Sequence, residues 1–453
     1  MKKAKFKMTG NGSRIEEVSE SSCLCASVLK KDAGVVEDDF NTETQRRRGA
    51  EFKMTEIGLI PEDWEVKRLG DVCEKIRNGY GYDFREQGIY PMSRIETISS
   101  GEINYQRVVK IAEEPPVEYR LKVGDILYSH INSLSYIGNV AQYEGKEILY
   151  HGMNLLLLRP IEKVDSVYLK FLLKSEPMRN MAKSVAKVAI NQASISTKEL
   201  AQFPLVVPPL AEQKAIAEAL SDVDALIAAQ EELIEKKRAI KQGAMQELLT
   251  GKKRLPGFGG KWIEKRLGDC ATMFAGGTPS SKIEGYYGGD IPWVSISDIS
   301  IAGKYIERTA ETLSDAGLNN SSAKWYPPNA LLFAMYASIG KCCIAKERMT
   351  SSQAILGIYD LIDIDVEFLY YLLTFRNDEF LMMGQTGTQS NLSKAIVEEI
   401  VINTPSLAEQ KAIAEVLSDM DAEISELEAQ KAKFESIKQG MMQELLTGKT
   451  RLV

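Results

Sequence analysis

The stretch KQGAMQELLTGK at residues 241–252 returns almost unchanged as KQGMMQELLTGK at residues 438–449. The two copies differ at one position, where Ala244 in the first corresponds to Met441 in the second. They lie 197 positions apart (438 − 241). Near-identity over a dozen residues at that distance indicates a duplication within the chain, and the same offset should relate the residues around it.

The repeat extends well beyond this dozen. LAEQKAIAEALSD at 210–222 returns as LAEQKAIAEVLSD at 407–419, and DWEVKRLGD at 63–71 is echoed by KWIEKRLGD at 261–269. From about residue 55 the chain therefore consists of two copies of one unit, each a variable block followed by a near-identical tail. Solenoids need three or more short repeats. Two long copies instead predict a pseudo-twofold arrangement within one chain, by analogy with homodimers.

Each tail has the pattern of a long helix. Apolar residues follow one another at steps of four and three, which is typical of a coiled-coil seam. The seam residues are Ile216, Leu220, Val223, Ile227 and Ile234 in the first tail and Ile413, Leu417, Met420, Ile424, Leu427 and Phe434 in the second. Each helix is predicted to have about 38 residues and a length of roughly 57 Å. A helix this long with one apolar stripe needs a partner, and the other copy is the obvious one.

Cap signals mark both ends of the predicted helices. Ser406 and Glu409 have the spacing of a capping box, in which each side chain satisfies a free backbone donor of the first turn. Pro209 precedes the same register in the first tail, which suits a helix start. Gly251 and Gly448 stand where the C-terminus of a helix favours glycine.

Two further glycines, Gly243 and Gly440, lie inside the predicted helices. Each should cost about 1 kcal/mol relative to alanine. One explanation is a close approach or a bend of the helix at that point, and the other is a tolerated defect. The sequence favours neither.

The variable blocks mix short strand-like runs with helical ones. DILYS at 125–129, ALLFAMY at 330–336 and AILGIYDL at 354–361 predict strands, whereas VEFLYYLLTF at 366–375 predicts a helix. The fold class is therefore α+β, with two mixed α/β domains held apart by two long antiparallel helices. The predicted divisions are a leader at 1–54, a first block at 55–207, a first helix at 208–252, a second block at 256–404 and a second helix at 405–449.

Composition excludes several classes of protein. The 453 residues carry a net charge of −7, which argues against a protein that coats nucleic acid by charge alone. No apolar run reaches the roughly 18 residues of a membrane helix, and the N-terminus has no secretory signal. The six cysteines form no CxxC pair, and only two histidines, His130 and His151, are present, so a metal site has little support. We expect a cytoplasmic protein with reduced thiols.

Motifs for catalysis are absent from the sequence. Gly448-Lys449-Thr450 resembles the end of a phosphate-binding loop, but Gln443 stands where that motif needs glycine, and the stretch ends a helix instead of starting one. Tyr326-Pro327-Pro328-Asn329 has the wrong order for the signature of amino methyl transfer. The sequence thus predicts a binding protein.

Polar residues at matching places in the two blocks are the candidates for reading DNA bases. The stretch at 191–196 aligns with that at 388–393, so that Gln192 lies opposite Gln389, and glutamine can bond adenine bidentately. Alternation in two aligned runs, 90–99 and 291–300, predicts polar pairs on one face of a strand. The candidates are Arg94, Glu96, Asn191, Gln192, Thr278, Ser280, Ser281, Lys282, Ser295, Ser297, Thr388, Gln389 and Asn391. Any one alone is more simply a polar surface residue. The set has more weight because the blocks differ while the tails stay the same.

The duplicated tails resemble those of one known family. A block ending in PPLAEQKAIAEAL, a long helix closing in QELLTGK and a second copy of both are similar to the specificity (S) subunit of Type I restriction–modification systems. The resemblance covers roughly residues 55–453 and leaves out the leader, whose role and true start it does not explain.

The resemblance implies a function without catalysis in this chain. Each block would be a target recognition domain that reads half of an asymmetric, bipartite site in double-stranded DNA. The helices would form an antiparallel coiled coil that sets the spacer and docks two modification (M) subunits. S-adenosylmethionine would bind the M subunits, which methylate adenine, and ATP and Mg²⁺ would serve partner subunits, including two restriction (R) subunits where these exist.

Two rival functions differ in their requirements. An autonomous fused restriction and methylation enzyme would need the catalytic motifs that the sequence lacks. A coiled-coil adaptor that binds proteins and no DNA would use the helices alone.

Overall fold

The computed structural model describes residues 51–82, 88–190, 192–385 and 391–452. Most of the predicted leader therefore lies outside the described residues. The chain forms two compact units, Met1–Trp64 and Glu65–Val453. In the first unit, strands β1 (Phe52–Thr55) and β2 (Gly58–Pro61) pair as an antiparallel hairpin.

The first block of the second unit is built on a four-stranded antiparallel sheet. The strand order is β4 (Cys73–Asn78), β10 (Leu156–Pro160), β7 (Ile126–Tyr128) and β9 (Val140–Gln142). Leu127, Ala141 and Leu157 are buried in its core. Helices α3 (Ser166–Lys174) and α4 (Glu176–Val185) follow this sheet in the chain. The strand predicted at 125–129 is confirmed by β7.

The second block is built on a five-stranded sheet of the order β15 (Thr272–Ala275), β22 (Ile355–Tyr359), β19 (Leu331–Ala334), β20 (Cys342–Ala345) and β17 (Tyr305–Ile306). A smaller sheet contains β18 (Glu311–Leu313), β16 (Tyr287–Val294) and β21 (Thr350–Ser351). Helix α9 (Val366–Phe375) has the bounds that the sequence predicts, and β19 and β22 confirm the two predicted strands.

The first and last strands of each block pair with one another. In the first block β3 (Glu65–Arg68) pairs with β13 (Pro204–Val207), and in the second β14 (Ile263–Arg266) pairs with β23 (Val401–Thr404). Each pair brings the start of a block beside its end, where the long helix begins. The duplication is therefore visible in the strand topology as well as in the sequence.

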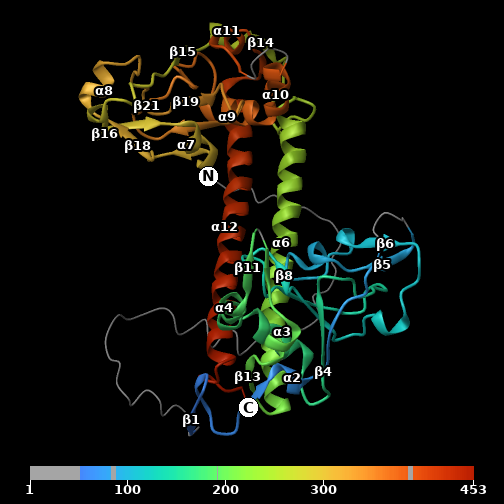
Figure 1. Cartoon of the computed structure of the whole chain (residues 1–453). Coiled ribbons are helices and arrows are strands. Elements are labelled where there is room, and N and C mark those ends of the chain that lie inside the picture. Colours follow the sequence, from blue (N-terminus) through green and yellow to red (C-terminus); the bar gives the residue numbers. More distant parts are fainter. Residues whose placement is uncertain (1–50, 83–87, 191, 386–390, 453) are drawn as a thin grey trace. The chain divides into compact units, whose positions relative to one another are not determined.

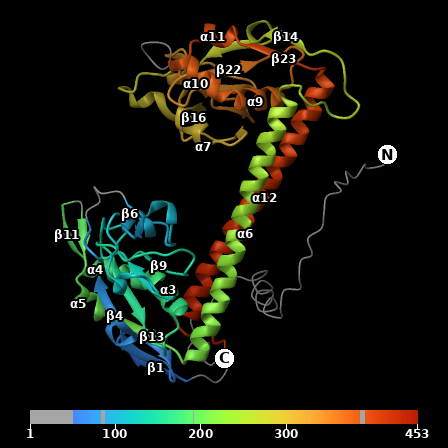
Figure 2. The ribbon, with the colours of Figure 1, turned by 90° about the vertical axis from the view of Figure 1, so that its right-hand side faces the viewer.

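The tails form two helices of 39 residues each, α6 (Leu210–Leu248) and α12 (Leu407–Leu445). They lie side by side in both views (Figure 1 and Figure 2). Ion pairs join Glu231 to Lys431 at 2.6 Å and Arg238 to Glu428 at 2.5 Å. Because the residue numbers rise along α6 as they fall along α12, the helices are antiparallel.

The apolar stripes of the helices are buried or half-buried, but they do not face only one another. Ile413 and Leu417 at the start of α12 belong to one core cluster with Phe368 of α9 and with Met245 and Leu248 of α6. The stripe thus joins each helix to the globular block at its end as well as to its partner helix.

The helix caps differ in part from the prediction. Ser406 Oγ accepts a hydrogen bond from the backbone N–H of Glu409 at 3.4 Å, which is half of the predicted capping box. The other half is missing because the Glu409 carboxylate accepts from Arg254 instead. Gly251 and Gly448 end the helices with φ of +69° and +71°, a left-handed conformation that glycine adopts readily.

The interpretation of Gly243 and Gly440 as points of close approach within the chain is wrong. A Cβ at either position would meet no heavy atom within 4 Å. Both residues are exposed.

Candidate nucleic-acid interface and its frame

Two buried carboxylates at the helix starts are held by arginines that follow the opposite helix. Arg254, after α6, donates from Nε and Nη2 to both oxygens of Glu409 in α12 at 2.5 Å. Arg451, after α12, donates to both oxygens of Glu212 in α6 at 2.5 and 2.7 Å. Both carboxylates have no exposed surface, so these bidentate, charge-assisted bonds offset the loss of their hydration. We call these pairs the two clasps.

The glutamine next to each clasped glutamate holds the helix to its own block. Gln213 Oε1 accepts from the backbone N–H of Asp165 at 2.8 Å, and its Nε2 donates to the Pro208 carbonyl at 2.8 Å. Gln410 repeats the first contact with Asp365 at 2.9 Å. Both aspartates cap the helices that follow them, α3 and α9. The repeated glutamate therefore joins one helix to the end of the other, and the repeated glutamine joins it to its block.

Of the candidate base-contacting residues, Gln192 lies on an exposed hairpin of the first block. It is exposed and begins β12 (Gln192–Ser194), which pairs with β11 (Lys187–Ala189) so that Ala189 lies opposite Gln192. The other edge of β12 pairs with β8 (Ile131–Asn132), which fixes the base of this hairpin. Asn191 lies outside the described residues.

Arg94 and Glu96 do not share a strand face, so that part of the prediction is wrong. The strand β5 (Tyr90–Met92) ends before them, and Ile95–Ile98 form a 3₁₀ helix. The backbone N–H of Arg94 donates to Thr97 Oγ1 at 3.0 Å, a local bond that competes with strand pairing. The Arg94 guanidinium donates to the Arg107 carbonyl at 3.0 Å.

Ser295 and Ser297 likewise leave the strand predicted for them. The strand β16 ends at Val294, and Ser295 is the N-cap of helix α7 (Ile296–Ile301). Ser295 Oγ donates to Asp298 Oδ2 at 2.7 Å and accepts from the Asp298 N–H at 3.3 Å, which completes a capping box. Its hydroxyl is thus used within the fold, and only Ser297 is exposed.

The second block presents a built loop after β15. Gly276 and Gly277 lie so close to neighbouring backbone that a Cβ would fall 2.2 Å from Ser351 O or Ala323 N. Trp293 Nε1 donates to the Gly277 carbonyl at 2.9 Å. These contacts anchor the loop, whose exposed polar residues are Thr278, Ser280, Ser281 and Lys282. Of the remaining candidates, Asn391 bridges to Tyr336, whereas Thr388 and Gln389 lie outside the described residues.

Sequence reasoning missed the clasps and the hairpin tip. Arg254 and Arg451 are related by the same offset of 197 as the rest of the repeat, so the signal for the clasps was present in the sequence. Ile190 directly follows β11 and is 95% exposed, a feature that no periodicity reveals.

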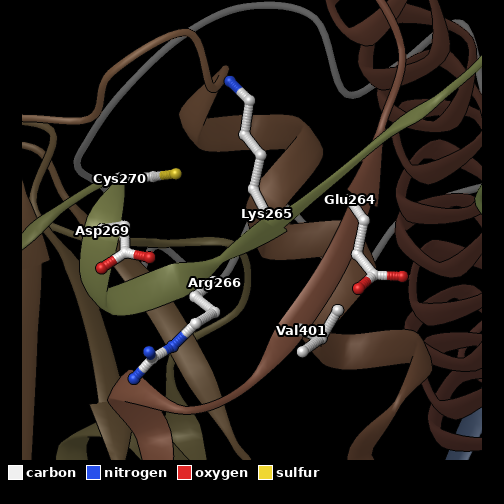
Figure 3. A pocket seen from close by; sticks show the side chains of 6 residues that line it. All are labelled: Glu264, Lys265, Arg266, Asp269, Cys270 and Val401. Atoms are coloured by element: carbon white, nitrogen blue, oxygen red, sulfur yellow. The ribbon is translucent and has the colours of Figure 1, made fainter.

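A hollow lies beside strand β14 of the second block. The hollow in Figure 3, of about 470 Å³, is lined by Glu264, Lys265, Arg266, Asp269, Cys270 and Val401. Lys265 and Arg266 point to opposite sides of β14, and Arg266 is paired with Glu399. Among the described residues no three His, Cys, Asp or Glu side chains are placed to hold a metal ion. No described helix is both long and apolar enough to cross a membrane.

Arg451→Ala is expected to lower the free energy of unfolding by about 3 kcal/mol, because it removes the bidentate arginine from the buried Glu212 carboxylate. Arg254→Ala should act in the same direction through Glu409. The matched control is Arg238→Ala, which removes an ion pair to the half-exposed Glu428 and should have a far smaller effect. Urea denaturation of the whole chain measures all three, and equal losses would contradict the clasps.

Acid should weaken the first block selectively. Burial lowers the pKa of His130 and of His151 from 6.5 to about 4. The unfolded chain therefore takes up protons between pH 6.5 and 4 while the folded chain does not, so stability is full above pH 6.5 and falls below it. Hydrogen-exchange protection factors at pH 7.5 and 5 should drop in the first block only, since the second contains no histidine. Equal losses in both blocks would contradict this assignment.

The chain matches one protein-family model twice. The family model described as "Type I restriction modification DNA specificity domain" matches residues 61–237 and again 260–435. A putative type I restriction enzyme MjaX specificity subunit from Methanocaldococcus jannaschii is 36% identical over 419 residues, which cover 88% of this chain and 97% of that protein. The duplication seen in the sequence thus coincides with two matches to one family.

Solved structures share the fold at low sequence identity. The crystal structure of a type I restriction–modification S subunit from M. genitalium has a TM-score of 0.55 at 14% identity and covers 84% of this chain and 96% of its own. A chain from a study of the assembly and conformational transition of a type I system has a TM-score of 0.55 at 18% identity, with coverage of 86% and 99%. These two likenesses concern the fold alone.

Proposed function

The chain belongs to the family of type I restriction–modification specificity subunits, and on that premise we propose that its two blocks read the two halves of one split DNA site. It is a targeting subunit with two recognition domains and not itself an enzyme. On this proposal the adenine-methylating chemistry, with S-adenosylmethionine, resides in M subunits. ATP and Mg²⁺ serve R subunits where these are present.

The observation that carries the proposal is that one frame holds two different blocks. The frame consists of helices α6 and α12 with their clasps and glutamine anchors. The clasps and the glutamine anchors are the same in both halves. The first block presents Gln192 on the β11–β12 hairpin, the second presents the anchored loop at 278–282, and the sequences of the two blocks differ outside the repeated stretches. Because the frame is shared and the outward residues differ, the two half-sites should differ, and the target should be asymmetric.

The helix pair suits the role of a spacer. A helix of 39 residues is about 58 Å long at 1.5 Å per residue. Two domains that read the same face of a duplex lie about one turn, or 34 Å, apart. The Gln213 and Gln410 anchors attach the blocks near the starts of antiparallel helices, hence at opposite ends of the pair. We propose that the helices and their clasps fix the separation of the half-sites.

The repeated dozen suits the docking of two copies of one partner. Its buried residues, such as Leu248 and Leu445, are explained by the fold. Its exposed ones are not, since Gly243 and Gln246 recur as Gly440 and Gln443 without contacts in the described chain that require them. An M subunit bound once at each copy accounts for this identity.

An apolar stripe leads along α6 to the first of these glycines. Leu226, Leu233 and Ile240 recur every seven residues, which places them on one side of the helix, and all three are exposed. Gly243 follows Ile240 by one further turn. A partner helix could cover this stripe and approach the backbone closely at the glycine, where no side chain intervenes.

The experiment that tests DNA reading is long-read mapping of N6-methyladenine in the source genome, with and without this gene. Loss of one split, asymmetric motif is the expected result. Gln192→Ala should then relax recognition in one half of the motif only, by about 1–3 kcal/mol at an adenine. Thr278→Ala in the other block is the matched control and should leave that half unchanged. An unchanged methylation pattern without the gene would favour the protein-binding adaptor.

The Gly243→Ala, Gly440→Ala double variant tests the docking of M subunits. Each substitution should stabilise the isolated chain by about 1 kcal/mol, because alanine is the better helix former and the added Cβ meets nothing. The same variant should weaken co-purification of M subunits. Lys261→Ala, at an exposed lysine outside the repeated dozen, is the control for general changes of the surface. Full partner binding by the stabilised variant would contradict docking at the glycines.

A further inference from the structure

The tip of the β11–β12 hairpin exposes an apolar side chain that the fold does not use. Among the described residues no large apolar side chain is more exposed than Ile190, at 95%, and Val188 on the same hairpin is 69% exposed. The base of the hairpin is firm, because Ala193 and Ile195 are buried and the Ile195 N–H donates to the His130 carbonyl at 2.9 Å. A ribbon anchored at its base, with an unburied isoleucine near its tip, is suited to contact another molecule.

Charge around the hairpin identifies the kind of molecule. Residues 183–199 contain three lysines and one glutamate, Glu199, although the whole chain has a net charge of −7. Lys187 is ion-paired with Glu199 at 3.1 Å, whereas Lys183 and Lys198 are exposed. A locally basic ribbon on an acidic chain favours a polyanion, and phosphate contacts of this kind position a protein on a duplex without reading its sequence.

A two-stranded ribbon enters the major groove of DNA, and this limits the chemical groups that Ile190 can contact. The major groove is about 12 Å wide and admits such a ribbon, and the apolar group on its base edges is the C5 methyl of thymine. Gln192 lies next to the same tip, and glutamine pairs with adenine in that groove. A tip that carries isoleucine and glutamine therefore matches an A·T pair or neighbouring A·T pairs.

We propose that Ile190 is a specificity-determining residue that contacts a thymine methyl in the half-site read by the first block. The inference rests on the proposed function and makes it specific at one position. The contact is a van der Waals one between the Ile190 side chain and the methyl group, while the exposed Lys183 contacts a phosphate.

The test is a double-mutant cycle between Ile190 and single thymine methyl groups. The complex of this chain with its M partner is titrated with duplexes of the mapped motif, in which each thymine of the first half-site is replaced in turn by uracil, which lacks only the methyl. One replacement should weaken binding by the native complex about fourfold, as expected for one buried methyl group. The Ile190→Ala complex should bind that duplex and its thymine parent equally well.

A second exposed isoleucine provides the matched control. Ile301 ends α7 in the second block and is 86% exposed. Ile301→Ala should retain the full penalty for the uracil replacement. Replacement of thymines in the second half-site should affect the native and Ile190→Ala complexes alike.

The binding results distinguish failure of the proposed role of Ile190 from failure of the proposed DNA reading. No preference of the native complex for any duplex would overturn the proposed function. Specific binding in which no uracil replacement couples to Ile190, or a first half-site without thymine, would overturn only the role of Ile190. Loss of the M partner from the Ile190→Ala complex would also overturn it, because the tip would then contact protein.

Discussion

The pairing of each helix start with the chain that follows the other helix is the constraint on which the rest of the second unit depends. Glu212 and Glu409 are buried, and a buried carboxylate is tolerable only if its charge and lone pairs are satisfied. The arginines that satisfy them come from the far end of the opposite helix. Antiparallel packing in one register brings both pairs together at once, so the clasps select that register as well as stabilising it.

The sequence predicted the parts of the fold that repeat and missed those set by local competition. Periodicity located α6 and α12 closely, and α9 fully, because the burial of a stripe governs all three. Alternation failed at Ser295, where a serine and an aspartate three residues apart close a capping box that ends the strand. Exposure at the hairpin tip depends on packing between distant segments, and no pattern within the hairpin records it.

The clasp and anchor residues and the exposed candidate residues of the blocks differ in how much a substitution affects stability. The clasp and anchor glutamates and glutamines shared by both halves are buried, so a substitution there alters the stability of the whole unit. Gln192, Ile190 and the polar residues of the loop at 278–282 are exposed, and changes at such positions usually affect stability by less than about 0.5 kcal/mol. On the proposed function, the DNA sequence that one block recognises can therefore change without disturbing the helices or the other block.

The fold explains only some of the residues that are identical in the two copies of the dozen, 241–252 and 438–449. Burial constrains Leu248 and Leu445, and a positive φ constrains Gly251 and Gly448. Neither applies to Gly243, which lies exposed inside a helix at a cost of about 1 kcal/mol and is matched at the same place in the other copy. Both glycines destabilise their helices although neither contacts any other part of the described chain. Their presence in both copies is explained if the same kind of partner molecule binds at Gly243 and at Gly440. On the proposed function, the symmetry of the chain reflects two copies of one partner, while the differences between the blocks reflect the two halves of the DNA site.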